Sequence, residues 1–331
     1  MNASPGITSA LLGASTPPGR AVVVSRRVVY RPGFWGTGVM LLLLHAGSAA
    51  AQYGQPRERS WGLGAQAVGL VTHATPAMDG ESIREWYLTQ PAIMAHAGLW
   101  GGALMATGTL NFERWTLDRG ELNAGIWGEG YVDRRHPHTF VHELVATLQG
   151  RMLGLDLSVT GGKGFAPFGT DDPMVRPFVK YPANHHLAQI LERGVVIAAV
   201  RRGALLLEGG IFNGDEPSTP SDFVNWDRFG DSWSARATLF PSAALELSGS
   251  YAFLASPEFP AGSGLDHRKR SVAARSETER GYTLVEWART DEYIGTERTA
   301  RYSTLLSETA FRRGGTLLAI RHERTLRPEE E

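Results

Sequence analysis

The sequence predicts an all-β protein, an antiparallel transmembrane β-barrel of about twelve strands. Three observations lead to this prediction. Apolar and polar residues alternate with a period of two in many segments, short and long connections alternate between those segments, and glycine and aromatic residues are abundant while charged residues are few. Of the 331 residues, 39 are glycine, 20% are charged and none is cysteine. The lack of cysteine excludes a disulfide scaffold and a thiolate metal site.

The N-terminal segment 1–51 is expected to be a signal peptide with an N-terminal extension. Three arginines between 26 and 31 precede an apolar stretch centred on 39–44, and the small residues Ala49-Ala50-Ala51 follow. This order of charged, apolar and small segments is that of a cleavable secretory signal. We place cleavage after Ala51, so that 52–331 is the exported chain and forms one outer-membrane β-barrel.

Charge and hydropathy narrow the class of protein further. Residues 1–51 hold four of the 33 basic residues and none of the 34 acidic ones, so the remaining 29 basic and 34 acidic residues give a formal net charge of −5. This balance argues against nucleic acid as a partner. No apolar run reaches the roughly 18 residues of a membrane-spanning helix. We expect a Gram-negative outer-membrane protein whose partners are outer-membrane lipid and small hydrophilic solutes or ions.

The strand pattern is clearest in 155–160, 233–239 and 245–253, where apolar residues alternate with polar or small ones. Short connections are expected near 150–153, 202–203, 241–242 and 313–315, and long ones at 165–191, 213–231 and 255–281. Tight turns at one end and long loops at the other are typical of outer-membrane barrels. The competing interpretation is a periplasmic β-sandwich, whose strands of about 5–6 residues are usually shorter than these segments.

Charged residues on the polar strand faces and in one loop are candidates for lining or constricting a lumen, because such groups set the ion preference of a pore. The candidates are Arg134, Arg135, Glu143, Asp156, Lys163, Asp171, Asp172, Arg176, Glu208, Arg236 and Glu246. One interpretation of the stretch 165–173 is a loop that folds into the lumen, where Asp171 and Asp172 would face the basic candidates. The alternative is a solvated outer loop.

Histidines provide the candidate metal site, and the candidate ligands are Asp133, His136, His138, His142, His185 and His186. In a strand, at ~3.3 Å per residue, His136 and His138 lie about 6.6 Å apart on one face, and His142 lies about 13 Å from His138, too far to join them without a bend. Imidazole ligands favour Cu or Zn as the cofactor. The alternative is that these histidines make structural hydrogen bonds under a loop.

Catalytic motifs are missing from the sequence. Glu143 follows the second histidine of 138–142, whereas the zinc-peptidase motif places its glutamate directly after the first. No nucleophile elbow of the form G-x-S-x-G occurs. We therefore expect no catalytic residues and no enzymatic activity.

Four segments carry a resemblance to a known family. They are the D-R-R-H-P-H run 133–138, Asn184-His185-His186, the F-N-G-D-E-P run 212–217 and the segment 231–236. In this order they resemble a largely uncharacterised family of porin-like outer-membrane β-barrels of Gram-negative bacteria with a D-R-x-H-P-H segment. The resemblance implies a channel for small hydrophilic solutes or ions.

Two alternatives remain open. Members of this family accompany copper or heavy-metal efflux genes, which implies a Cu- or Zn-binding envelope protein linked to metal tolerance. The other alternative is a structural barrel, or a periplasmic β-sandwich binding domain. The end of the chain, 327–331, is charged and contains proline, whereas such barrels usually end in a strand with an aromatic last residue. We expect either that closing strands are missing or that this tail lies outside the membrane.

Overall fold

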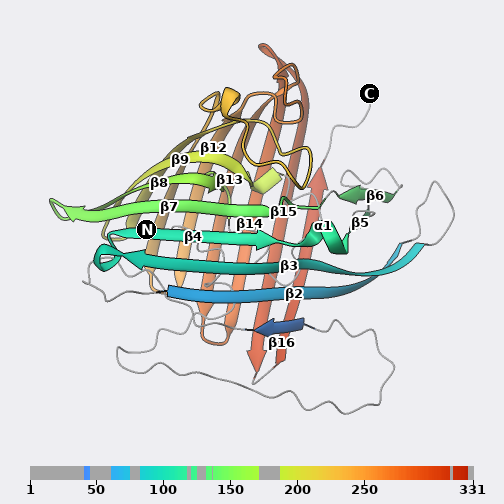
Figure 1. Cartoon of the computed structure of the whole chain (residues 1–331), viewed down its shortest axis with the longest axis horizontal. Coiled ribbons are helices and arrows are strands. Elements are labelled where there is room, and N and C mark those ends of the chain that lie inside the picture. Colours follow the sequence, from blue (N-terminus) through green and yellow to red (C-terminus); the bar gives the residue numbers. More distant parts are fainter. Residues whose placement is uncertain are drawn as a thin grey trace.

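The computed structural model describes residues 41–44, 61–74, 83–117, 121–124, 132–135, 137–170, 187–313 and 316–326. One 14-stranded antiparallel sheet dominates these residues, and helix is limited to single turns (Figure 1). Strand β1 lies at the edge of the sheet, and the other thirteen strands follow one another in chain order, with only the small hairpin β5–β6 outside the sheet. The predicted all-β antiparallel fold is confirmed, and the expected number of about twelve strands is low.

The strands of the main sheet vary from 4 to 17 residues in length. They are β1 (Leu41–Leu44), β2 (Trp61–Ala74), β3 (Ile83–Leu99), β4 (Leu104–Asn111), β7 (Val141–Met152), β8 (Leu155–Gly164), β9 (Arg193–Arg202), β10 (Leu205–Phe212), β11 (Ser232–Ser242), β12 (Leu245–Leu254), β13 (Asp266–Thr278), β14 (Gly281–Ile294), β15 (Glu297–Arg313) and β16 (Thr316–Leu326). The hairpin β5 (Glu121–Ala124) and β6 (Val132–Arg135) and the helical turns η2 (Trp100–Gly102), α1 (Glu113–Thr116) and η4 (Trp226–Arg228) complete the described elements. None of these helices is long and apolar enough to span a membrane.

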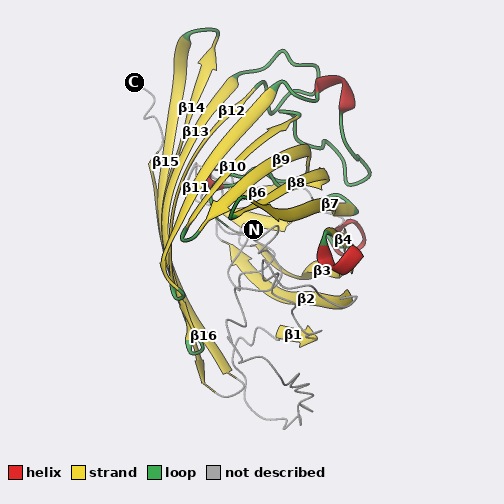
Figure 2. Ribbon diagram, turned by 90° about the vertical axis from the view of Figure 1, so that its left-hand side faces the viewer, coloured by secondary structure: helices red, strands yellow, loops and turns green. Residues whose placement is uncertain are grey.

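The sheet curls strongly but does not close into the predicted barrel (Figure 2). Among the described residues, β1 pairs only with β2 and β16 pairs only with β15. Thirteen consecutive antiparallel strands leave β2 and β16 pointing in the same direction, so these two strands are not antiparallel partners. β1 itself lies inside the segment that we predict to be the signal peptide.

The connections alternate in length as expected. At one end of the sheet, two-residue turns at 153–154, 203–204, 243–244 and 279–280 join the strands. At the other end lie the long connections 112–140, 165–192, 213–231 and 255–265, and the two-residue turn Gly295-Thr296 between β14 and β15 is the exception. The expectation of one long loop over 255–281 is wrong, because 266–278 forms strand β13.

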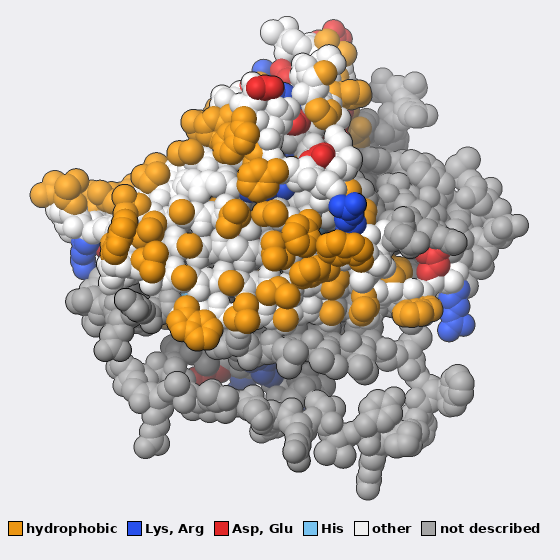
Figure 3. Space-filling view, viewed as in Figure 1, with side chains coloured by type: hydrophobic (Ala, Val, Ile, Leu, Met, Phe, Trp, Pro, Cys, Tyr) orange, Lys and Arg blue, Asp and Glu red, His pale blue; other side chains and the backbone are white. Residues whose placement is uncertain are grey.

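The two faces of the sheet differ in polarity. We call the face with the buried side chains the inner face and the opposite face the outer face. On β10, Glu208 and Phe212 are buried on the inner face, whereas Leu205, Leu207 and Ile211 are exposed on the outer face. The pattern recurs along the sheet, and Figure 3 shows hydrophobic side chains spread over the visible outer face with few charged ones. The sheet therefore exposes its apolar face and buries its polar one, the reverse of a soluble sheet.

The first part of the connection after β8 lies against the inner face. The Gly169 amide donates to Ser250 Oγ over 2.9 Å, and Thr170 Oγ1 donates to Glu286 over 2.9 Å. Gly169 has φ 63°, and a Cβ there would lie 1.6 Å from the carbonyl oxygen of Ala188, so only glycine fits. Phe168 joins a small apolar cluster on this face. Residues 165–170 thus fill part of the inner side, as the interpretation of an inward-folding loop requires.

Candidate functional site

Two of the candidate histidines meet where the chain enters β7. Residues 137–140 are not part of a strand, and β7 begins at Val141. The Phe140 amide donates to Pro220 O in a loop, while the Phe140 carbonyl accepts from the Asn111 amide at the end of β4. The chain bends, and the rings of His138 and His142 lie 4.8 Å apart, centroid to centroid. The prediction that one straight strand keeps them about 13 Å apart is wrong for this reason.

Glu113 holds the first histidine. It lies two residues after the end of β4, and its amide donates to Asn111 Oδ1 over 2.7 Å, which fixes the start of α1. Its carboxylate is fully buried and accepts from Thr89 Oγ1 at 3.0 Å and the Gln90 amide at 2.9 Å. The amide and Nδ1 of His138 lie 3.0 and 3.1 Å from the other carboxylate oxygen. Such a multiply bonded carboxylate is a rigid anchor for the imidazole.

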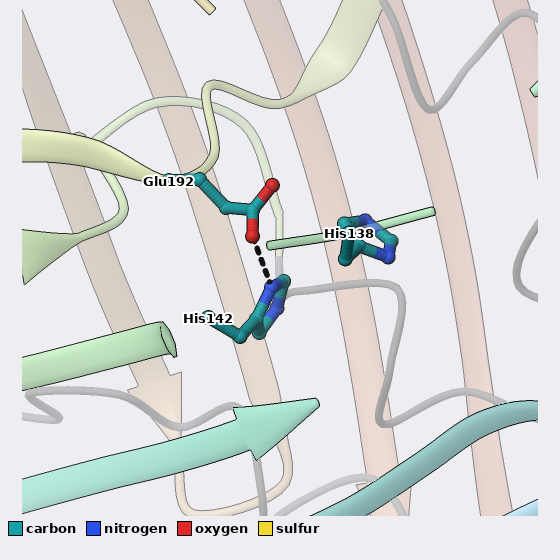
Figure 4. Close-up of side chains that lie close together, drawn as sticks. All are labelled: His138, His142 and Glu192. Atoms are coloured by element: carbon teal, nitrogen blue, oxygen red, sulfur yellow. Dashed lines mark hydrogen bonds and ion pairs between the residues drawn. The ribbon is translucent and has the colours of Figure 1, made fainter. Parts of the chain in front are cut away.

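Glu192 holds the second histidine in the same way (Figure 4). Its Oε1 lies 2.9 Å from His142 Nδ1 and accepts from the amide and hydroxyl of Thr139 at 2.9 and 2.5 Å. Burial alone would raise the pKa of the Glu192 carboxyl, but the charges of His142 and His138 and the hydrogen bonds from His142 and Thr139 hold that pKa well below its usual range. The carboxylate is therefore ionised at neutral pH.

Lys163 completes this cluster on its loop side. Its side chain is fully buried, and Nζ donates to Thr139 Oγ1 over 2.7 Å and to Asp222 O over 3.1 Å. Lys163 was a candidate for the lumen lining, and it instead ties the histidine segment to the loop 213–231. We call Glu113, His138, His142, Glu192 and Lys163 the histidine–glutamate cluster.

The cluster has the chemistry of a metal site. One ligand atom each from His138, His142 and Glu192 lies within 4.8 Å of the others. Because each Nδ1 faces a carboxylate, coordination by both imidazoles would use Nε2, and the carboxylates would orient the rings, as in carboxylate–histidine–metal arrangements. Imidazole ligands suit Zn or Cu.

The structure does not describe the side chains of the other predicted metal ligands. His136, His185 and His186 lie outside the described residues, and Asp133 lies on β6 with its side chain outside them. The two glutamates were not among the candidates. No local pattern marks Glu113 or Glu192, and only the position of Glu113 two residues after a strand end hints at an anchoring role.

The lumen candidates on the inner face form ion pairs. Arg236 donates Nε and Nη2 to Glu208 at 2.6 and 3.0 Å, and its Nη1 donates to Gly169 O at 3.2 Å. This bidentate pair therefore also fastens the inward segment 165–170 to β11. Glu286 lies beside it and accepts from Thr170 and Ser271.

The remaining lumen candidates are scattered. Glu143 is buried and accepts from Thr109 Oγ1 at 3.4 Å, and Asp156 lies 3.6 Å from Arg151 near the tight-turn end. Glu246 is half-buried on β12. Outside the described residues lie Asp171, Asp172 and Arg176, and the side chains of Arg134 and Arg135 on β6 lie outside them too.

A cavity of about 260 Å³ lies beside the histidine–glutamate cluster, among the long loops. Its walls include the acidic residues Glu192, Asp215, Glu216 and Asp222. Burial acts to raise the pKa of Asp222, but hydrogen bonds from Thr219 and Ser218 and the charge of Lys163 lower it overall. Carboxylates thus line the cavity, and two of them, Glu216 and Asp215, are paired with Arg193 and Arg228.

Comparisons with known proteins assign no family to this chain, so its class is argued from the fold and the site. No protein-family model matches the chain, and no curated protein matches it. The fold and the site together define a class by physical criteria alone: one antiparallel meander with an apolar outer face, a charged inner face partly filled by a loop, and a buried histidine–glutamate cluster.

Proposed function

We propose that this protein is an outer-membrane, porin-like channel that passes small hydrophilic solutes or ions. The observation that carries the proposal is the outer face of consecutive strands β3 to β12, whose exposed outward charges, Arg84 of β3 and Arg202 of β9, stand at strand ends. Its other outward residues include Ile93, Ala95, Ala97 and Leu99; Leu104, Ala106, Gly108 and Leu110; Leu144, Ala146, Leu148, Gly150 and Met152; Leu155, Leu157, Val159 and Gly161; Val196, Ala198 and Val200; Leu205, Leu207, Gly209 and Ile211; Trp233, Ala235, Ala237 and Leu239; and Leu247, Gly249, Tyr251 and Phe253.

An apolar surface of this extent is unfavourable in water. Soluble monomers rarely expose contiguous apolar patches larger than a few hundred Å². Acyl chains remove this cost, and a tilted strand of about 9–11 residues spans the apolar core of a bilayer. Strands β7, β8, β9, β11 and β12 have 10 to 12 residues, which matches that requirement.

The inner face supports passage of polar solutes. Its charged and hydroxyl side chains, such as Glu208, Arg236, Glu286 and Ser250, suit a wet lumen better than a dry core. Segment 165–170 narrows that lumen from one side. The carboxylate-lined cavity at the long-loop end and the net charge of the exported chain favour cations over anions.

The test combines fractionation with conductance. The exported chain is expected with outer-membrane markers, and the refolded protein in a planar bilayer is expected to give stepwise, mildly cation-selective currents. An Arg236→Met, Glu208→Met variant, which releases Gly169 without leaving a lone charge, is expected to conduct more per step. Recovery as a freely soluble periplasmic protein would favour the sandwich interpretation, and an inserted protein without conductance would indicate a structural barrel.

A second candidate function is metal binding in the envelope, and the 4.8 Å grouping of His138, His142 and Glu192 favours it. Cu²⁺ or Zn²⁺ titration of refolded protein is expected to give one saturable site that a His138→Ala, His142→Ala variant loses. His322→Ala, on the outer face of β16, is the matched control. Because binding needs neutral imidazole, affinity is expected to fall as the pH drops below about 6.5. Equal affinity in the variant and the wild type would dismiss this site.

A further inference from the structure

The outer face changes character on strands β12 to β15 toward the long-loop end. Outward side chains that are paired across neighbouring strands form rows. Three successive rows, in order toward the long loops, are Val272–Trp287–Leu305, Tyr251–Arg270–Arg289 and Phe253–Arg268–Asp291–Arg301. The first row continues the apolar surface, since all three side chains are exposed. Adjacent outward rows are about 6.8 Å apart along a strand. Arginines therefore begin directly where the apolar surface ends.

Three of these arginines converge on one carboxylate. Asp291 is fully buried beneath them and accepts from Arg270 Nη1 at 2.8 Å, from Arg289 Nη2 at 2.8 Å and from Arg301 Nε at 2.6 Å. The arginine side chains stay 41, 24 and 43% exposed. Asp291 therefore holds the three guanidinium groups side by side at the surface.

The cluster keeps an excess of positive charge and of hydrogen-bond donors. Arg268, which stacks 4.0 Å over the ring of Tyr293, brings the number of arginines around Asp291 to four. The next outward row adds Asp266, whose carboxylate accepts the Ser256 amide. Each guanidinium has five N–H donors, and Asp291 accepts only one from Arg270 and one from Arg301. We call Arg268, Arg270, Arg289 and Arg301 the arginine cluster.

We propose that the arginine cluster binds the phosphate group of an anionic lipid at the membrane surface. This inference rests on the proposed outer-membrane location. Guanidinium groups bind phosphate oxygens in pairs and with fixed geometry. The aromatic side chains Trp233 and Tyr251, whose rings lie 5.4 Å apart beside the cluster, are of the type that gathers at the edge of a bilayer.

Position argues for a lipid and not a free anion. A phosphate held by the cluster lies about one or two outward rows beyond Trp287 and Leu305. The acyl chains of a lipid bound there would cover the exposed apolar row, whereas inorganic phosphate would leave it uncovered. A phosphate-bearing lipid therefore satisfies both the charge and the apolar surface with one molecule.

The experiment tests the membrane location and the lipid site in separate steps. Wild-type protein is first floated with phosphatidylcholine vesicles, which tests the location alone. Native mass spectrometry in a zwitterionic detergent then measures the dissociation constant for lipid A, a glycolipid with two phosphates. The test variant is Arg270→Gln, Arg289→Gln, Arg301→Gln, Asp291→Asn, which removes the cluster together with the carboxylate that it neutralises. The matched control is Arg151→Gln, Arg202→Gln, with the same net charge change at the tight-turn end.

We expect the test variant to bind lipid A at least tenfold more weakly than wild type, and the control to bind equally well. Arg268→Gln, whose side chain pairs with no carboxylate among the described residues, is a second variant that is expected to keep the fold and to weaken binding about threefold. Equal binding by the test variant, or by Arg268→Gln if the test variant does not fold, overturns the lipid site while flotation upholds the membrane location. Full displacement of lipid A by millimolar inorganic phosphate overturns the assignment to a lipid. Failure of wild type to float overturns the location and the site together.

Discussion

Leucine-to-arginine substitutions at two depths of β7 test whether the outer face meets lipid. Leu148 is 56% exposed, and its cross-strand neighbours are Leu104 and Val159. It stands five residues before Leu153 in the turn, about 17 Å along the strand at ~3.4 Å per residue. With a tilt of about 40°, Leu148 lies about 13 Å from the turn, half the height of a ~25 Å apolar band. An arginine there costs about 2–4 kcal/mol of folding free energy in a bilayer.

Leu153→Arg is the matched control, because Leu153 is 91% exposed in the turn at the end of the same strand. At the edge of a bilayer the same substitution costs about 0–1 kcal/mol. In water, both exposed positions would tolerate arginine within about 0.5 kcal/mol. The assay is urea unfolding of protein refolded in phosphatidylcholine vesicles. A difference below about 1 kcal/mol between the two variants would refute the lipid-facing assignment of the outer face.

Three further predictions follow from the inner face and the loops. Arg236→Met is expected to lower the free energy of unfolding by about 3–5 kcal/mol, because it leaves Glu208 buried without its partner; adding Glu208→Met should restore most of the loss in a urea titration. Gly169→Ala is expected to displace segment 165–170, since a Cβ would meet a carbonyl oxygen at 1.6 Å, and to raise single-channel conductance; unchanged conductance would show that this segment does not narrow the path. Hydrogen bonds lower the pKa of Asp222 in the folded protein. These bonds therefore stabilise the loop fully at pH values above the unfolded pKa of about 3.9, and the stabilisation is lost as the pH falls through the lower folded pKa. Hydrogen exchange of the two amides that Asp222 accepts should therefore accelerate under acid, relative to intrinsic rates, in wild type but not in Asp222→Asn.

The sequence predicted those strands whose outward residues are apolar. In β11 and β12 every second residue is apolar, aromatic or small, so the period of two is visible without a structure. β13 was missed because Arg268 and Arg270 point outward while His267, Lys269 and Ser271 point inward, so both faces are polar. A strand that extends beyond the apolar band loses the pattern that identifies it.

The candidate site was predicted in part. His138 and His142 were singled out, but their partners Glu113 and Glu192 are 25 and 50 positions away in sequence, and only the folding of α1 and the long loops brings them together. The spacing argument failed because it assumed a straight strand across 136–142. In the structure, the Thr139 and Phe140 amides donate to Glu192 and to Pro220, so these two amides bond to loop residues and not to a neighbouring strand.

The open edges of the sheet bear directly on the proposed wall. Unpaired backbone N–H and C=O groups cost several kcal/mol each in a bilayer, so a wall in lipid has to close. Without β1, the other thirteen antiparallel strands have β2 and β16 as parallel edges, whereas bacterial barrels have an even number of strands. β1 supplies an antiparallel partner for β2, but it spans only Leu41–Leu44 and falls within the segment predicted to be cleaved. Since β16 still carries the outward apolar pair Leu318 and Ile320, its outer face belongs to the same wall. If cleavage removes β1, strand parity requires an odd number of further antiparallel strands between β16 and β2 for the wall to close.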